Sequence, residues 1–212
     1  MEDTQKNATR ILSILKKLHA DAPVTYLNHR NPFEMLVATI LSARTTDAFV
    51  NKITPELFKR YPTPAKLAKA DLDDIRTLIH GVGAYNNKSV FLKDTAQMLV
   101  DKFSGEVPRN LEDLVKLKGV SRKTANVVLQ VAFAINEGVV VDTHIGRVSK
   151  RLGLTKEEKP DKVEQDLMEL FPQKEWANYA RYAGAHGRRI CPSRKPKCSE
   201  CALNDVCPSS EL

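Results

Sequence analysis

Cysteine is missing from the first 190 positions of this 212-residue chain, and all four cysteines fall within the last 22 residues. Long apolar runs are missing as well, and none approaches the roughly 18 residues that are needed to cross a bilayer. The polar start MEDTQKNATR lacks the apolar stretch of a signal peptide. These absences predict a cytoplasmic protein without a membrane segment.

Strand-like alternation is also missing, except for a brief segment at 139–141 that could be extended. Signals for helix starts recur instead, as a capping residue that is often followed by proline. The fold class that these patterns predict is all-α, with no internal repeat. Helix starts are expected at Thr4, Asn31, Thr54, Thr63, Asp71 and Asp142.

The balance of charge is basic, with a formal net charge of +7. Such a surplus favours a polyanionic partner such as nucleic acid, because each Lys or Arg placed against a phosphate releases condensed counterions. Charge alone leaves a basic protein without such a partner equally open.

The stretch LVKLKGVSRKTANVV predicts a short helix, a tight turn at Gly119 and a second helix from about Arg122. Free N–H groups at the start of the second helix, together with its dipole, suit a phosphate, although an ordinary helix connection would read the same way. Lys123 falls at the margin of the apolar face. A solvated lysine is the simpler interpretation, whereas burial beside Arg122 would make the amine a usable nucleophile.

Asp142 follows three valines and precedes Thr143-His144. A role as helix N-cap is enough to explain an aspartate at this position. A histidine such as His144 more often has a structural role than a role in proton transfer. The local sequence therefore does not decide whether either residue takes part in catalysis.

The cysteines follow the pattern C-x6-C-x2-C-x5-C. Inside a cell this favours metal ligation over disulfides. Structural zinc usually shows two short C-x2-4-C pairs, whereas the single pair and uneven spacing here fit a four-thiolate iron–sulfur cluster. Basic residues that would suit a phosphate-facing loop crowd the same region, namely Arg188, Arg189, Arg194, Lys195 and Lys197.

Four motifs occur in a distinctive order: LKGVSRKTANVV, VDTH at 141–144, HGRRIC at 186–191 and the cysteine pattern. In this order they resemble the endonuclease III family, which consists of helix-hairpin-helix DNA glycosylases with AP-lyase activity. The resemblance extends over nearly the whole chain and includes NPFEMLVATILSARTTD at 31–47 and YNNK at 85–88.

The resemblance implies two helical domains with DNA in the cleft between them. Residues 25–135 would form a six-helix barrel domain that carries the helix-hairpin-helix, and residues 1–24 with 136–212 would form the domain with a [4Fe–4S] loop. The protein would be nucleoid-associated and would act on double-stranded DNA with damaged bases or abasic sites. The sequence gives no hint of an oligomer, so a monomer is the default expectation.

The resemblance also implies roles for single residues. Lys123 matches the family's nucleophilic lysine, and Asp142 matches its essential aspartate. The [4Fe–4S] ligands would be Cys191, Cys198, Cys201 and Cys207. The DNA contacts would be Arg44, Gly83, Ala84, Gly119, Val120, Ser121, Arg122, Arg194, Lys195 and Lys197.

This chain departs from the family pattern at four positions. Lys118 and Ser121 replace the proline and second glycine of the usual hairpin, and Ser121 can cap the following helix. Arg44 stands where the family has a glutamine that fills the gap left by a flipped base, and Ala84 stands where it has a wedging leucine. The last two changes leave the range of lesions open.

Three functions compete at this point. The first is a bifunctional glycosylase and AP lyase acting on oxidised pyrimidines. The second is a monofunctional mismatch glycosylase of the same superfamily, which would activate water and would not need Lys123. The third is a non-catalytic iron–sulfur DNA-binding protein, in which Lys123 contacts phosphate and Asp142 only caps a helix.

Overall fold

The computed structural model describes residues 2–211, and within this range it contains helices and turns but no strand. The predicted all-α class is confirmed. The extended segment expected at 139–141 pairs with no other strand in the described chain, and Val139 and Val141 instead bury their side chains in a helical core. None of the described helices is both long and apolar enough to cross a membrane.

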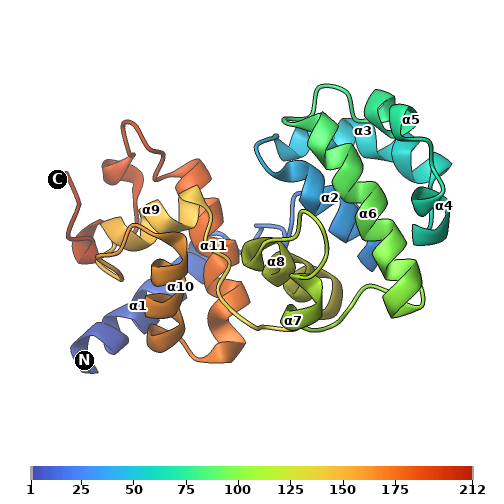
Figure 1. Ribbon diagram of the computed structural model, residues 1–212. Helices are drawn as coiled ribbons and strands as arrows, with labels where there is room; N and C mark the ends of the chain where they lie inside the picture. The colour runs from blue at the N-terminus through green and yellow to red at the C-terminus, as the bar shows by residue number, and fades with distance from the viewer. Residues whose placement is uncertain (1, 212) are drawn as a thin grey trace. The chain divides into compact units, whose positions relative to one another are not determined.

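The chain divides into two compact units, labelled by their helices in Figure 1. The continuous unit comprises residues 25–135, and the split unit comprises residues 1–24 together with 136–212. Each unit has a hydrophobic core of its own.

The continuous unit is built around α2, which is buried from Phe33 to Leu41 and packs against α3, α6 and α8. A helix that is apolar on nearly all sides has to be enclosed by its neighbours, which explains its central position. The helices of this unit are α2 (Pro32–Ser42), α3 (Asp47–Arg60), α4 (Pro64–Ala68), α5 (Leu72–Leu78), α6 (Tyr85–Phe103), α7 (Leu111–Leu114) and α8 (Arg122–Phe133).

Several predicted helix starts are confirmed by their hydrogen bonds. The Asn31 side chain accepts from the N–H of Glu34, and proline follows directly, as expected for a capped start. The same arrangement of a side-chain acceptor at the N-cap is found at Thr63, Asp71 and Asp142.

Two predicted helix starts are wrong. Thr54 and Pro55 lie inside α3, because that helix is capped earlier by Thr46, whose hydroxyl accepts from the N–H of Phe49 at 3.3 Å. Thr54 is buried within the helix and does not cap it. Thr4 lies within α1, which already begins at Glu2.

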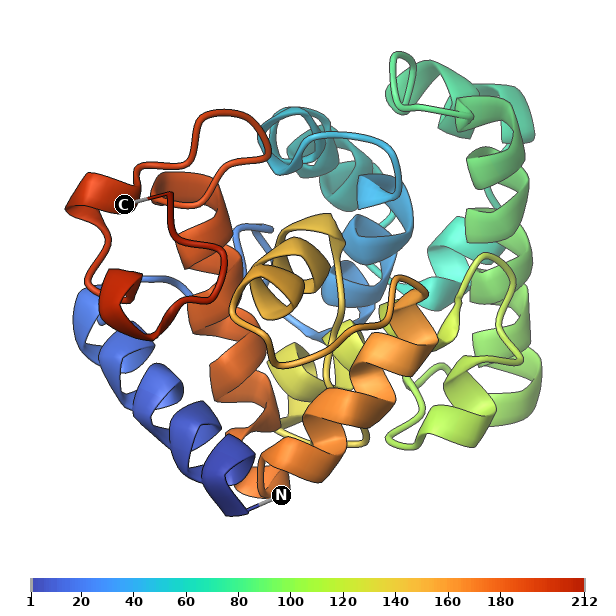
Figure 2. The same ribbon diagram turned by 90° about the vertical axis from the view of Figure 1, so that its left-hand side faces the viewer.

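The split unit is held together by α11, which packs against α9 and against α1. Figure 2 shows the blue α1 running alongside the orange-to-red α11. Arg181 on α11 donates through Nε to the carbonyl of Ala22 at 2.7 Å. The elements of this unit are α1 (Glu2–Leu18), α9 (Thr143–Arg151), α10 (Pro160–Leu170), η1 (Gln173–Glu175), α11 (Trp176–Arg189), η2 (Cys198–Glu200) and η3 (Asn204–Val206).

Candidate active site and cysteine pocket

The turn between α7 and α8 rests on α6. Gly119 adopts a φ of 75°, a left-handed conformation that favours glycine. A Cβ at this position would lie 2.8 Å from the ring of Phe91 on α6. Thr95, one turn further along α6, donates its hydroxyl to the carbonyl of Lys118 at 2.8 Å. The helix below therefore fixes the backbone of the turn.

Ser121 begins α8 as its N-cap. Its hydroxyl accepts from the N–H of Thr124 at 3.2 Å, so serine supplies a hydrogen bond that a glycine could not. The N–H of Val120 is used inside the turn, where it donates to the carbonyl of Leu117 at 3.2 Å. The remaining N–H groups at the start of α8 are of the kind that bind anions.

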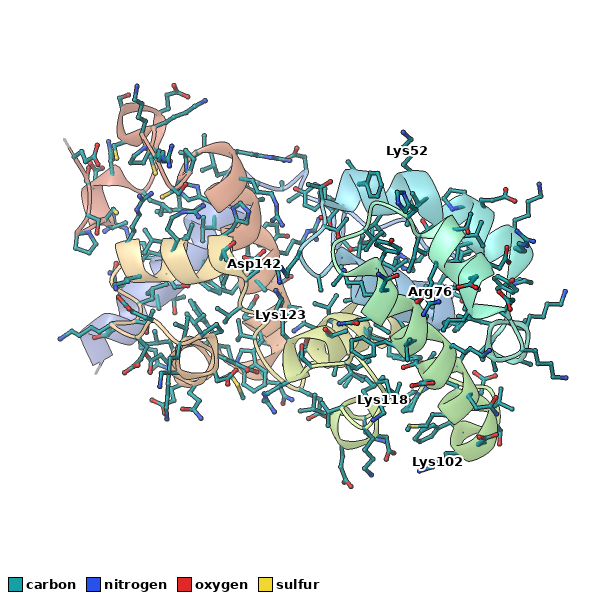
Figure 3. All side chains as sticks on the ribbon, turned by 45° about the horizontal axis from the view of Figure 1, so that its top comes forward. Lys52, Arg76, Lys102, Lys118, Lys123 and Asp142 are labelled. Carbon is teal, nitrogen blue, oxygen red and sulfur yellow. The ribbon has the colours of Figure 1, made fainter. Side chains whose placement is uncertain are left out.

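Lys123 lies in the first turn of α8, and its side chain is exposed (Figure 3). The sequence allowed a buried lysine stem at the margin of the apolar face, but burial begins with the next helical positions, Ala125 and Asn126. The amine is thus open to a ligand, directly after a turn suited to a phosphate.

Asp142 lies at the start of α9 in the split unit (Figure 3). Its Oδ1 accepts from the N–H groups of His144 and Ile145 at 2.9 and 2.8 Å, which makes it the N-cap of the helix. Its Oδ2 lies 3.5 Å from the guanidinium of Arg188, and the carboxylate keeps 22% of its side chain exposed. The His144 ring contacts Arg147 at 3.2 Å. One carboxylate oxygen is therefore committed to the helix, while the other is held more loosely.

Two turns of the continuous unit meet at the positions where the family pattern is broken. We name them the paired turns: residues 43–45 after α2 and residues 81–84 before α6. Arg44 and Ala84 both have left-handed backbone, with φ of 59° and 57°. The N–H of Gly83 donates to the hydroxyl of Thr45 at 3.0 Å, and a Cβ at Gly83 would lie 2.8 Å from the carbonyl oxygen of Arg44. The two predicted probing positions are therefore brought together.

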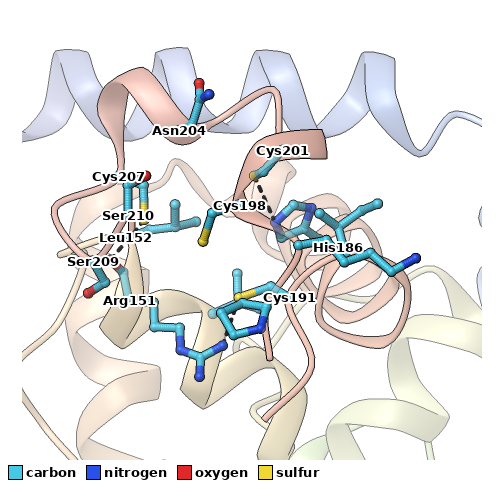
Figure 4. A pocket seen from close by; sticks show the side chains of 14 residues that line it. Arg151, Leu152, His186, Cys191, Cys198, Cys201, Asn204, Cys207, Ser209 and Ser210 are labelled. Atoms are coloured by element: carbon cyan, nitrogen blue, oxygen red, sulfur yellow. Dashed lines mark hydrogen bonds between the residues drawn. The ribbon is translucent and has the colours of Figure 1, made fainter. Parts of the chain in front are cut away.

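The four cysteines line one pocket of the split unit, together with side chains from α9 and α11 (Figure 4). None of them is in a disulfide. Arg151 on α9 donates to the sulfur of Cys191 at 3.2 Å, and the sulfur of Cys207 lies 3.4 Å from the Arg151 carbonyl. Burial raises the pKa of the Cys201 and Cys207 thiols. In the described chain no three His, Cys, Asp or Glu side chains are close enough to hold a metal ion.

Two buried histidines connect this pocket with the end of α1. The ring of His186 lies 3.1 Å from that of His19 and, on its other side, 3.7 Å from the sulfur of Cys201. Burial lowers the pKa of His186 to about 4, so the ring is neutral at neutral pH. A neutral ring can accept a hydrogen bond from His19 at Nδ1 and donate from Nε2 to the sulfur.

The loop between Cys191 and Cys198 carries exposed basic side chains. Arg194, Lys195 and Lys197 are all exposed there, and the backbone of Lys197 is tied to the carbonyl of Ile190 at 2.9 Å. The loop thus presents positive charge from the rim of the cysteine pocket.

The sequence did not predict the residues that stabilise these sites through contacts with positions far away in the chain. Arg151, His19 and Lys88 contact their partners across many positions of the chain, and no local pattern announces such contacts. Of these three residues, only Lys88 lies in a stretch that carries the family resemblance, namely YNNK. His186, the partner of His19, lies in another such stretch, HGRRIC.

The short helix α7, the turn at Gly119 and α8, in a chain whose described residues form no strand, define a helix-hairpin-helix protein. Within that class, the chain belongs to the HhH-GPD superfamily of base excision DNA repair proteins, whose family model matches residues 37–173.

Individual relatives are similar over almost the full length. Endonuclease III of Synechocystis sp. is 49% identical over 211 residues, which cover 100% of this chain and 96% of the relative. A solved structure of a non-covalent endonuclease III–DNA complex is similar with a TM-score of 0.92 and 40% identity, over 97% of this chain and 96% of that one. A trapped covalent endonuclease III–DNA intermediate matches with the same values.

Proposed function

We propose that the protein is a base excision repair DNA glycosylase with AP-lyase activity, which removes oxidised pyrimidines from duplex DNA and cuts the strand 3′ to the site. The observation that carries this proposal is the place of Lys123 in the first turn of α8, directly after a turn suited to a phosphate, at the position that matches the family's nucleophilic lysine. The DNA in the solved structures to which this chain is similar, including a covalent intermediate, supports the same conclusion.

Binding begins with the backbone of the DNA. The N–H groups of Gly119 and Ser121 and the N-terminal end of α8 hold a phosphate, with Arg122 adding charge. The exposed basic residues of the cysteine loop, Arg194, Lys195 and Lys197, contact further phosphates. The damaged nucleotide leaves the base stack, because its C1′ atom cannot otherwise be reached.

Base release follows at C1′ of the flipped nucleotide. The neutral Lys123 nitrogen forms a bond to C1′ while the glycosidic bond breaks, and the base departs with that electron pair and takes up a proton. Asp142 Oδ2, the oxygen not committed to the helix, stabilises the positive charge on the sugar and accepts the proton that the amine loses.

Strand cutting uses the same lysine. Opening of the sugar ring gives an imine between Lys123 and C1′, which makes the protons on C2′ acidic. Removal of one such proton drives electrons towards C3′ and expels the 3′ phosphate by β-elimination. Hydrolysis of the imine then returns the free amine.

We further propose that the four cysteines hold a [4Fe–4S] cluster. The donor set fits this group, because four thiols that form no disulfide line one pocket. Arg151 and His186 supply hydrogen bonds to sulfur of the kind that stabilise bound thiolates. The cluster has a structural role, which is to order the basic loop. The protein would act as a monomer in the cytoplasm, on the nucleoid.

Reductive trapping tests the proposed function. Borohydride reduces an imine to a stable amine, so the wild-type protein should form a covalent adduct with duplex DNA that contains thymine glycol or an abasic site. Lys123→Ala should lose the adduct and still bind DNA. Lys118→Ala removes an exposed lysine from the same hairpin and serves as the matched control, in which the adduct should persist.

The alternatives give different outcomes in this experiment. A wild-type protein that releases a base but forms no adduct is a monofunctional glycosylase. A protein that binds DNA but releases no base from any lesion and forms no adduct is a non-catalytic DNA-binding protein.

A further inference from the structure

The end of α2 and the first of the paired turns are held by a buried lysine of α6. Lys88 is only 6% exposed, although it carries an amine. Its Nζ donates to the carbonyl of Leu41 at 2.8 Å and to the carbonyl of Ala43 at 2.5 Å. These carbonyls lie at and just beyond the last turn of α2, where the helix leaves acceptors without partners. Lys88 therefore supplies hydrogen-bond donors to the C-terminal end of α2, directly before Arg44.

The position is costly for a charged side chain. In the described part of the chain, carbonyls and not a carboxylate hold the Lys88 amine. Burial, together with the nearby Arg44 guanidinium, lowers the pKa of Lys88 to about 8. An apolar side chain would be enough to fill the space that Lys88 occupies. The buried amine therefore indicates that its hydrogen bonds to the two carbonyls are what the site requires.

The contacts beyond Lys88 lead directly to the paired turns. Ala43, whose carbonyl it holds, directly precedes Arg44, and Arg44 has left-handed backbone. The next residue, Thr45, receives the hydrogen bond from Gly83. Ala43 belongs to the first turn, and only Arg44 separates it from Thr45, which contacts the second turn. A displacement of Ala43 would therefore move Arg44 and weaken the contact between the turns.

We propose that Lys88 is a positioning residue for lesion recognition, which acts by holding Arg44 in the conformation that the paired turns present to the damaged base pair. This proposal rests on the proposed function, since it assigns Lys88 to the base-release step. Base release requires a stacked nucleotide to be extruded and its gap to be occupied. An abasic site has no base to extrude, so strand cutting there depends less on Arg44.

Lys88→Met tests the proposal, because methionine retains the unbranched shape and removes the donor. Lys93→Met is the matched control: Lys93 lies on the same helix and also donates to a backbone carbonyl, that of Ala70 at 2.8 Å, away from the paired turns. We expect Lys88→Met to slow single-turnover release of thymine glycol by on the order of 10- to 100-fold, as for a displacement of about 1 Å. Cutting at a preformed abasic site should stay within about threefold of wild type, and Lys93→Met should leave both rates near wild type.

Amide hydrogen exchange provides a readout that does not depend on activity. In Lys88→Met the N–H groups of Thr45 and Gly83 should exchange faster, because their hydrogen bonds to Ser42 and Thr45 depend on the turn at Ala43. Unchanged exchange at both amides overturns the positioning role. Wild-type protein that releases no thymine glycol overturns the proposed function instead, so the two failures are distinguishable.

Two further outcomes decide the proposal. An equal loss of base release and abasic-site cutting in Lys88→Met would contradict it, since the effect would then be general. Should Lys88→Met not fold, Lys88→Gln keeps a polar side chain at this position but is too short to reach both carbonyls. The same selective loss of base release is expected there, and an unselective loss would contradict the proposal.

Discussion

Asp142 shows how one side chain can combine a structural with a chemical role. Oδ1 accepts two backbone hydrogen bonds and caps α9, while Oδ2 faces Arg188 at the longer distance of 3.5 Å. The cap fixes the orientation of the carboxylate, and the second oxygen remains available to a developing positive charge. The capping role is therefore a part of the proposed catalytic role and not an alternative to it.

The two roles can be separated by substitution. Asparagine caps helices as well as aspartate does, so Asp142→Asn should keep the free energy of unfolding within about 0.5 kcal/mol of wild type. It should lower base release by on the order of 100- to 1,000-fold, because the negative charge is lost. Asp142→Ala should lose activity and, in addition, about 1 kcal/mol of stability.

Urea denaturation and single-turnover base release measure the two effects. An Asp142→Asn protein with wild-type activity would show that Asp142 only caps the helix. An Asp142→Ala protein as stable as Asp142→Asn would show instead that the cap contributes nothing.

Residue roles were predictable where the partner is near in sequence. Asp142 and Ser121 bond to N–H groups two or three positions away, and a capping pattern contains all of that information. Lys88 and Arg151 reach partners more than 40 positions away, the carbonyl of Leu41 among them. Those contacts follow only from the packing of α6 on α2 and of α9 beside the cysteine pocket.

At the scale of elements, the hairpin shows which departures from the family pattern are tolerated. Ser121 has a φ of −81°, which any residue adopts, so the second glycine of the usual pattern is not required here. Gly119 is different, because it combines a left-handed φ with the ring of Phe91 directly beneath it.

A pair of glycines separates these two constraints. Gly119→Ala should destabilise the protein by about 2 to 3 kcal/mol, from backbone strain and from the displaced Phe91 ring. Gly105 also has a left-handed φ, of 79°, but a Cβ there has open space around it, so Gly105→Ala should cost only about 1 kcal/mol. Urea denaturation measures both values, and equal losses would show that the contact with Phe91 adds nothing.

Most helix starts were predictable from local signals, and Thr54 is a case in which two such signals compete. Thr54-Pro55 has the form of a capped start, yet Thr46 caps α3 eight positions earlier and the helix continues through the proline. The choice is made by packing, since Thr54 and its neighbour Leu57 are both buried in the core that α3 helps to form. The sequence alone contains no signal that ranks one threonine above the other.

At the scale of the whole molecule, the two units can be observed separately. The only tryptophan of the chain, Trp176, begins α11 in the split unit, and its indole N–H donates to the carbonyl of Phe171 at 2.8 Å. Its fluorescence therefore reports the folding of the unit that contains the cysteine pocket, whereas circular dichroism reports the helices of both units.

Loss of a cysteine should affect the split unit first. Wild-type protein should be brown and contain about four iron atoms per chain. Cys207→Ser should lower the iron content and lower the temperature at which Trp176 fluorescence changes, while the helices of the continuous unit unfold as before. Ser209→Ala, which alters the same pocket without removing a thiol, is the control. A colourless protein that contains zinc would contradict the cluster.

The split unit also has a consequence for how the chain is made. Its helix α1 precedes the continuous unit, whereas α10 and α11, which cover α1, follow it. A ribosome that adds about 5 to 20 residues per second leaves Ile11 and Leu15 of α1 without partners for on the order of ten seconds. The continuous unit needs no residue beyond Ile135, so it can fold during this interval. Helix α1 is thus synthesised before the continuous unit but buried after it, once the segment that leads into the cysteines has been made.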